Sequence, residues 1–194
     1  MLNMKHLLII LLVGFVAACG GPPGGGPQPG TTSDINALTQ KIISLGPDVD
    51  PNEAARAAQI AYDYTYELAQ QYQITDPPLI HNMKVNTGRK PRGLCWHWAE
   101  DMENRLNSEN FQTLELHRAI ANHDKPLFIE HSTAIIGRRG DSMYDGVVID
   151  PWRYGGKLFW EVTREDTRYG WEPQLEVLRK TGRLIVRGEP VPAG

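Results

Sequence analysis

The order of hydrophobic patterns along the chain most constrains its fold. Apolar residues recur at helical spacing in the first half, at 33–45, 51–71 and 94–106. The second half changes to strand-like segments separated by turn-forming residues, at 111–121, 126–138, 146–153 and 158–162. A short helical turn at 175–178 and a last strand at 183–187 complete the expected elements. Helices followed by strands predict an α+β fold, in which N-terminal helices pack on an antiparallel sheet.

The second helix has the clearest start signal. Asp50 is suited to the N-cap, Pro51 to the first helical position and Glu53 to the third. The segment 74–92 that follows this helix shows no periodicity and is rich in turn-forming residues, so we expect a long loop. Because it leads into a cysteine, we interpret it as one wall of a substrate cleft, with three polar candidates: His81, Asn82 and Arg89.

Gly93-Leu94-Cys95-Trp96 places a thiol where this loop becomes a helix. The first turn of a helix has backbone N–H groups without intrahelical partners and the positive end of the macrodipole. Both favour a thiolate, which is the nucleophilic form of cysteine. A buried, unreactive core cysteine is the alternative reading of Cys95.

Two later residues have the chemistry that a nucleophilic thiol needs. Alternation along the expected strand places His131 on the same face as Ile129, Thr133 and Ile135, and Asp150 ends the next strand. Acyl transfer requires a nucleophile, a base and an orienting carboxylate, and a hairpin between the two strands would let the last two face each other. The N–H of Cys95 is the predicted oxyanion donor. Taken singly, the histidine could be a core residue and the aspartate a turn former.

Two segments with distinct compositions precede the expected folded domain. Residues 1–18 have a basic start at Lys5, an apolar run at 7–16 and small residues at the end, as in a secretory signal peptide. Residues 19–33 are rich in glycine and proline and are expected to form a flexible tether. The domain is therefore expected at 34–194.

The stretch Val16-Ala17-Ala18-Cys19 resembles the lipobox of bacterial lipoproteins. The resemblance implies cleavage before Cys19, diacylglyceryl attachment to its sulfur and N-acylation, with palmitate as the expected acyl group. Gly20 stands where lipoproteins retained at the inner membrane often carry aspartate, so a Gram-negative host would imply the outer membrane, facing the periplasm. Lipidation would leave Cys95 as a lone thiol in an exported domain.

Three stretches, 93–99, 130–134 and 148–152, resemble the signatures of the transglutaminase-like (papain-like) cysteine enzyme superfamily. The resemblance implies a core with the nucleophile at a helix N-terminus, followed by histidine and aspartate on successive strands. It gives Cys95 the role of nucleophile, His131 that of general base and Asp150 that of orienting acid. The chain is shorter than true transglutaminases and has no obvious calcium-binding loop, which bears on the reaction type more than on the fold.

These observations predict a lipid-anchored cysteine enzyme of the bacterial cell envelope. It would transfer acyl groups from a peptide or protein amide, cell-wall peptides included, as a peptidase, amidase or transamidase. A non-catalytic transglutaminase-like binding or assembly module is the alternative. No cofactor or metal is expected, because spacings typical of metal ligands are missing. A net charge of −3 without a basic, aromatic-rich patch argues against nucleic acid as a partner.

Overall fold

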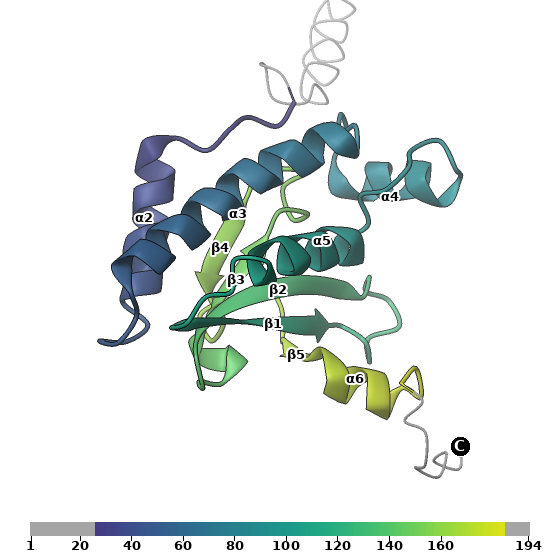
Figure 1. Cartoon of the computed structure of the whole chain (residues 1–194). Coiled ribbons are helices and arrows are strands. Elements are labelled where there is room, and N and C mark those ends of the chain that lie inside the picture. The colour runs from purple at the N-terminus through teal and green to yellow at the C-terminus, as the bar shows by residue number, and fades with distance from the viewer. Residues whose placement is uncertain (1–25, 185–194) are drawn as a thin grey trace, which may run out of the picture.

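The computed structural model describes residues 26–184 of the chain (Figure 1). The predicted signal peptide, the predicted lipidation site Cys19 and most of the strand predicted at 183–187 lie outside the described residues. Four helices come first: α2 (Thr32–Ile43), α3 (Pro51–Gln71), α4 (Pro78–Asn86) and α5 (Cys95–Asn107). Five strands follow, namely β1 (Leu114–Ala121), β2 (His131–Arg138), β3 (Val147–Asp150), β4 (Phe159–Val162) and β5 (Glu172–Pro173).

The strands form one antiparallel sheet in the order β4-β3-β2-β1-β5. The 3₁₀ helix η2 (Met143–Asp145) connects β2 to β3, and α6 (Gln174–Lys180) follows β5. The predicted α+β fold, with N-terminal helices packed on an antiparallel sheet, is confirmed.

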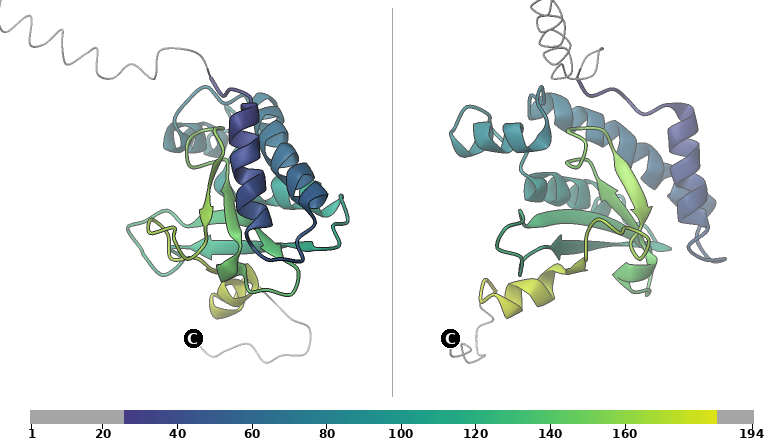
Figure 2. Two further views of the ribbon diagram at one scale, coloured as in Figure 1. Left: turned by 90° about the vertical axis from the view of Figure 1, so that its left-hand side faces the viewer. Right: turned by 180° about the vertical axis from the view of Figure 1, so that it is seen from behind.

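The sheet is covered on both faces, but by different elements. Helices α3 and α5 lie on one face with α2 beside α3, whereas α6 lies on the other side of the sheet (Figures 1 and 2). Alternation along β2 and β3 directs one set of side chains into the helical core: Ala134, Ile136, Val147 and Ile149. The alternate residues, Ile135 and Val148, pack on the opposite face of the sheet with Met143 and Trp171.

The start of α3 ties the helical layer to the sheet. The Asp50 carboxylate accepts hydrogen bonds from the backbone N–H groups of Asn52 (2.7 Å) and Glu53 (3.3 Å), as an N-cap should. Glu53 reaches across to the chain before β1, where its carboxylate accepts from the N–H of Gln112 at 2.6 Å and of Thr113 at 2.8 Å. Burial by itself would raise the pKa of Glu53, but the hydrogen bonds from Thr113 and Gln112 outweigh it and lower the pKa.

The expectation of a structureless loop at 74–92 is wrong, because this segment contains α4. The helix exposes Leu79, Ile80 and Met83 and buries His81. The helix is nine residues long, shorter than the window of about 11–18 residues over which helical periodicity is read, so its pattern is too brief to predict a helix.

Several predicted boundaries also differ: β1 begins at Leu114 instead of residue 111, and β3 ends at Asp150 instead of residue 153. β2 begins at His131 instead of residue 126, because residues 126–130 belong to the loop between β1 and β2. The end of the predicted tether packs on the domain: a Cβ added to Gly30 would lie 2.3 Å from the Tyr62 ring. Helix α2 already begins at Thr32. Within residues 26–184, no helix combines the length and the apolar character needed to cross a bilayer.

We predict that Glu53→Gln lowers the free energy of unfolding at pH 7 by about 1–3 kcal/mol, because an amide replaces a buried acceptor that serves several donors. The deficit should shrink as the pH falls below about 4, because the wild-type carboxyl, whose folded-state pKa is lowered, then becomes protonated too. Urea unfolding at both pH values measures this, with the exposed Glu165→Gln as control. An unchanged midpoint at pH 7 would contradict it.

Candidate active site

A glycine turn fixes the start of α5. Gly93 has φ of +119°, and a Cβ at this position would lie 2.4 Å from Nε2 of His81. Any other residue would be strained and would collide with the imidazole. The ring of His81 in turn donates a hydrogen bond from Nε2 to the carbonyl oxygen of Arg92 at 2.8 Å. This close packing makes Cys95 the first residue of α5.

His97 caps the helix from within its first turn. Its Nδ1 accepts from the backbone N–H groups of Gly93 and Leu94, both at 3.2 Å. Burial and the positive charge of Arg92 lower the pKa of His97, which keeps Nδ1 available as an acceptor. Trp96, its neighbour in the sequence, is 47% exposed, whereas His97 is buried because the capping bonds draw its ring inward.

The Cys95 side chain meets the end of the sheet, where β2 begins. It is 8% exposed, and its Sγ lies 3.6 Å from the carbonyl oxygen of Glu130. Its apolar surroundings are formed by Leu68, Tyr72, Ile74, Trp98 and Trp152. The backbone N–H of Cys95 has no hydrogen-bond partner among residues 26–184, so it is free to bind an oxyanion.

His131 and Asp150 form a buried pair beside this thiol. The distance between His131 Nε2 and Asp150 Oδ2 is 2.7 Å, and each side chain is 1% exposed. Burial by itself would lower the pKa of His131, but the Asp150 carboxylate and the Cys95 sulfur raise it to about 9. The other ring nitrogen, Nδ1, has no hydrogen-bond partner in the described part of the chain and is left for the thiol.

Three aromatic rings hold the imidazole. The ring centroid of His131 lies 4.6 Å from that of Trp152, 4.7 Å from that of Tyr169 and 5.3 Å from that of Trp171. Trp152 and Trp171 are thus both buried and adjacent to the candidate site. Trp160 lies elsewhere and donates to the hydroxyl of Tyr62 at 2.9 Å. Trp152 and Trp171, but not Trp160, therefore pack directly on His131.

A second buried ion pair lies behind Asp150, and the sequence did not reveal it. Arg153 Nε donates to Asp150 Oδ2 at 2.9 Å, and its terminal nitrogens donate to both oxygens of Asp166 at 3.1 and 2.6 Å. Trp171 Nε1 also donates to Asp166 at 2.9 Å. Burial would raise the pKa of Asp150, but His131 and Arg153 outweigh this effect and lower it. The three-residue spacing from Asp150 to Arg153 was the only available signal, and Asp166 offered none.

The three polar residues predicted to line a cleft wall differ in burial and in their distance from the candidate site. His81 is buried under the Gly93 turn. Asn82 reaches the candidate site, since its Oδ1 accepts from Trp152 Nε1 at 3.1 Å. Arg89 is exposed beyond the end of α4. Only Asn82 therefore contacts a residue that packs on the triad.

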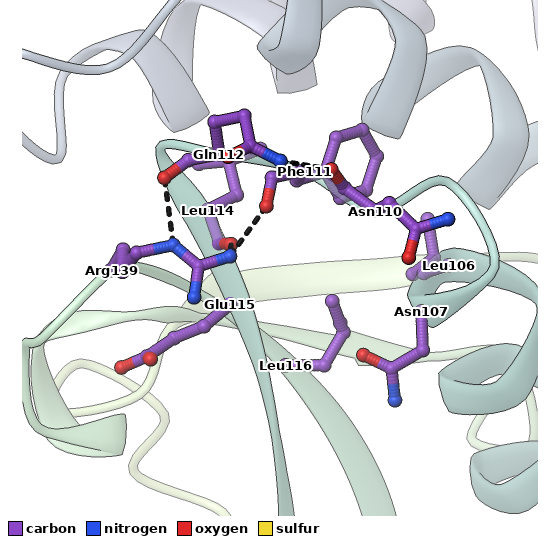
Figure 3. A pocket seen from close by; sticks show the side chains of 9 residues that line it. All are labelled: Leu106, Asn107, Asn110, Phe111, Gln112, Leu114, Glu115, Leu116 and Arg139. Carbon is purple, nitrogen blue, oxygen red and sulfur yellow. Dashed lines mark hydrogen bonds between the residues drawn. The ribbon is translucent and has the colours of Figure 1, made fainter.

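A hollow of about 570 Å³ lies at the other end of the β1–β2 pair (Figure 3). Leu114, one of its lining residues, pairs with Arg138, whereas His131 pairs with Ala121 at the opposite end of the two strands. Arg139 spans this hollow and donates to the carbonyl oxygens of Phe111, Gln112 and Leu114. The residues that line this hollow include no cysteine or histidine, so Cys95, His131 and Asp150 remain the candidate site.

No cluster of three or more histidine, cysteine or acidic side chains within residues 26–184 has the arrangement of a metal site. Comparison of the chain with family models, with curated proteins and with solved structures gives no match.

We predict that Asp150→Asn lowers the rate of Cys95 alkylation at pH 6 at least tenfold. Without the carboxylate, burial dominates and the pKa of His131 falls, so the imidazolium no longer stabilises a thiolate. Iodoacetamide labelling as a function of pH measures this. Asp124→Asn, the same change at an exposed residue of the β1–β2 loop, is the control. Equal profiles for the wild type and Asp150→Asn would contradict the prediction.

We predict that Asp166→Asn lowers the free energy of unfolding by about 3–5 kcal/mol, because it leaves the buried Arg153 guanidinium without one of its two carboxylates. Asp145→Asn breaks an exposed pair with Arg164 and should cost at most about 1 kcal/mol. Urea unfolding of both variants provides the comparison. Similar losses in the two variants would show that burial of the Arg153 pair has no special energetic role.

Proposed function

We propose that the chain is a cysteine enzyme that transfers acyl groups from peptide or protein amides, with a transglutaminase-like arrangement of Cys95, His131 and Asp150. The observation that carries the proposal is the 2.7 Å contact between His131 Nε2 and Asp150 Oδ2, buried beside a thiol at a helix N-terminus. This contact fixes the orientation of the imidazole and leaves Nδ1 to exchange a proton with the thiol.

The first half of the reaction uses His131 twice, first as a base and then as an acid. His131 Nδ1 takes the thiol proton, and the Cys95 sulfur attacks the amide carbonyl carbon to form a tetrahedral intermediate. The backbone N–H of Cys95 is placed to donate to the new oxyanion. When the C–N bond breaks, the imidazolium gives its proton to the leaving amine, and a thioester remains on Cys95.

The second half depends on the acceptor. With water, His131 takes a proton as the oxygen attacks the thioester, and a carboxylic acid and free Cys95 are produced. With an amine, the same steps produce a new amide. Asp150 stays ionised throughout and stabilises the imidazolium, which suits its lowered pKa.

The proposal places this activity at the bacterial cell envelope, with the domain anchored through a lipid on Cys19. For a Gram-negative host this would be the outer membrane, facing the periplasm. Peptides and proteins of that compartment, including cell-wall peptides, are then the proposed substrates. The support for this part is the lipobox-like sequence alone.

The second candidate is a binding or assembly module with the same fold and no turnover. The observation that favours it is the shielding of the thiol. Cys95 is 8% exposed and its sulfur faces the carbonyl oxygen of Glu130, an arrangement that a structural thiol would also have. In this alternative, the charges around His131 would stabilise the fold.

The deciding experiment is the pH dependence of Cys95 alkylation in a chain that starts at Gly20, which retains every contact described above. A free thiol with a pKa of about 8.5 is only about 0.3% ionised at pH 6. We predict that wild-type alkylation at pH 6 stays within a few fold of the rate at pH 8. We expect His131→Gln to lower it at least tenfold, while His123→Gln, at the β1–β2 loop, leaves it unchanged.

Turnover completes the test. Peptide amides should be cleaved by the wild type but not by Cys95→Ser, with near-ultraviolet circular dichroism showing that both are folded. A thiol that reacts only after denaturation would reject the enzyme in favour of the binding module. Turnover that survives Cys95→Ser would reject the proposed nucleophile.

A further inference from the structure

Helix α4 presents an apolar face to solvent. Leu79, Ile80 and Met83 are 53%, 42% and 60% exposed. At 100° per residue they fall within about 100° of arc, so they form one continuous stripe. The opposite side carries His81, which is buried against Gly93. The most apolar side of this helix therefore faces away from the protein.

The segment around this stripe is basic, although the whole chain is acidic. Residues 77–99 contain Lys84, Arg89, Lys90 and Arg92 and no aspartate or glutamate, in a chain of net charge −3. Two of these charges are balanced by acids outside the segment: Lys84 pairs with Asp76 and Arg92 with Asp101. Arg89 and Lys90 have no carboxylate partner among the described residues, and Lys90 Nζ donates one hydrogen bond, to the uncharged carbonyl oxygen of Gln73 at 2.9 Å. A local excess of positive charge therefore lies beside the stripe.

The N-terminal segment joins the domain next to α4. A Cβ on Gly26 would lie 3.5 Å from the carbonyl oxygen of Ile74, four residues before the helix. The loop after β3 links the two regions, because Gly156 packs against Pro27 and Gly155 against Pro78. Figures 1 and 2 show the described chain beginning at the same edge of the molecule as α4.

We propose that α4 and the basic loop after it dock on an anionic bilayer surface, the surface that carries the lipid anchor proposed at Cys19. Six residues separate Cys19 from Gly26, and an extended chain of this length reaches at most about 25 Å. An anchored domain would therefore hold α4 near the headgroups. Leu79, Ile80 and Met83 enter the boundary between headgroups and acyl chains, and Arg89 and Lys90 contact the acidic headgroups.

Docking of α4 would also orient the candidate site. Asn82, on the same helix, accepts a hydrogen bond from Trp152, and Trp152 packs on His131. The side of the domain that contains Cys95 is thereby held at a fixed orientation to the membrane. The docking proposal requires no catalysis, so its outcome is separate from that of the alkylation experiment.

The experiment uses the non-lipidated chain from Gly20, so that neither the apolar run at 7–16 nor an acyl chain contributes to binding. Sedimentation with vesicles of phosphatidylglycerol and phosphatidylethanolamine, and with vesicles of phosphatidylcholine, measures the partition coefficient. We expect binding to the anionic vesicles only. Leu79→Gln/Met83→Gln should weaken it about tenfold or more, because the buried apolar surface is lost while a good helix former is kept.

Two further variants make the result specific. Arg89→Gln/Lys90→Gln should weaken binding to the anionic vesicles about tenfold or more and remove most of its salt dependence. Leu175→Gln removes a leucine that is 55% exposed on α6, far from α4, and should change nothing. Absence of binding to the anionic vesicles, or equal losses for Leu175→Gln and Leu79→Gln/Met83→Gln, would overturn the proposal.

A second copy of the chain could cover the stripe instead. Sedimentation equilibrium without lipid tests this. A monomer at micromolar concentration is the result expected for a membrane-docking face. A dimer that Leu79→Gln/Met83→Gln dissociates, without vesicle binding, would overturn the proposal in favour of self-association.

Discussion

The candidate site depends on a chain of alternating charges that runs through the protein interior. Imidazole, carboxylate, guanidinium and carboxylate follow one another from His131 through Asp150 and Arg153 to Asp166, with contacts of 2.6–3.1 Å. An isolated buried charge is costly, and each member of this chain is stabilised by its neighbours. Because Asp150 is held from two sides, it cannot turn away from the imidazole without leaving Arg153 underpaired.

Cys95 lies beside His131 although the two residues belong to different layers of the fold. His131 belongs, by alternation, to the face of β2 that is turned away from α5, together with Ile135. The two groups meet because His131 is the first residue of its strand and Cys95 the first residue of its helix, so both lie at an edge of their layers. Gly93 and His97 then fix the helix start on which this meeting depends.

In helix α4, polar side chains are directed inward and apolar side chains face solvent. It places an imidazole and an amide inward, where His81 Nε2 donates to the carbonyl oxygen of Arg92 and Asn82 Oδ1 accepts from Trp152, and leaves three large apolar side chains outside. Protein interiors tolerate polar side chains that are hydrogen-bonded, as these two are through one atom each. The apolar stripe then has no role in the core, which is why a contact outside the protein accounts for it best.

The sequence alone determined the parts of this protein that depend on local physics. Asp50 and Pro51 marked the start of α3, and the hairpin expected between two successive strands predicted that His131 and Asp150 would face each other from neighbouring strands. Tertiary structure decided what local pattern cannot encode. Helix α4 was missed because its nine residues are too few for a clear periodic signal, and only the tertiary structure shows which of its sides is buried. Arg153 and Asp166 were missed because the role of a charged residue depends on its partners in space. A buried ion pair between residues 13 positions apart leaves no periodic trace, since only the packed fold brings its two members together.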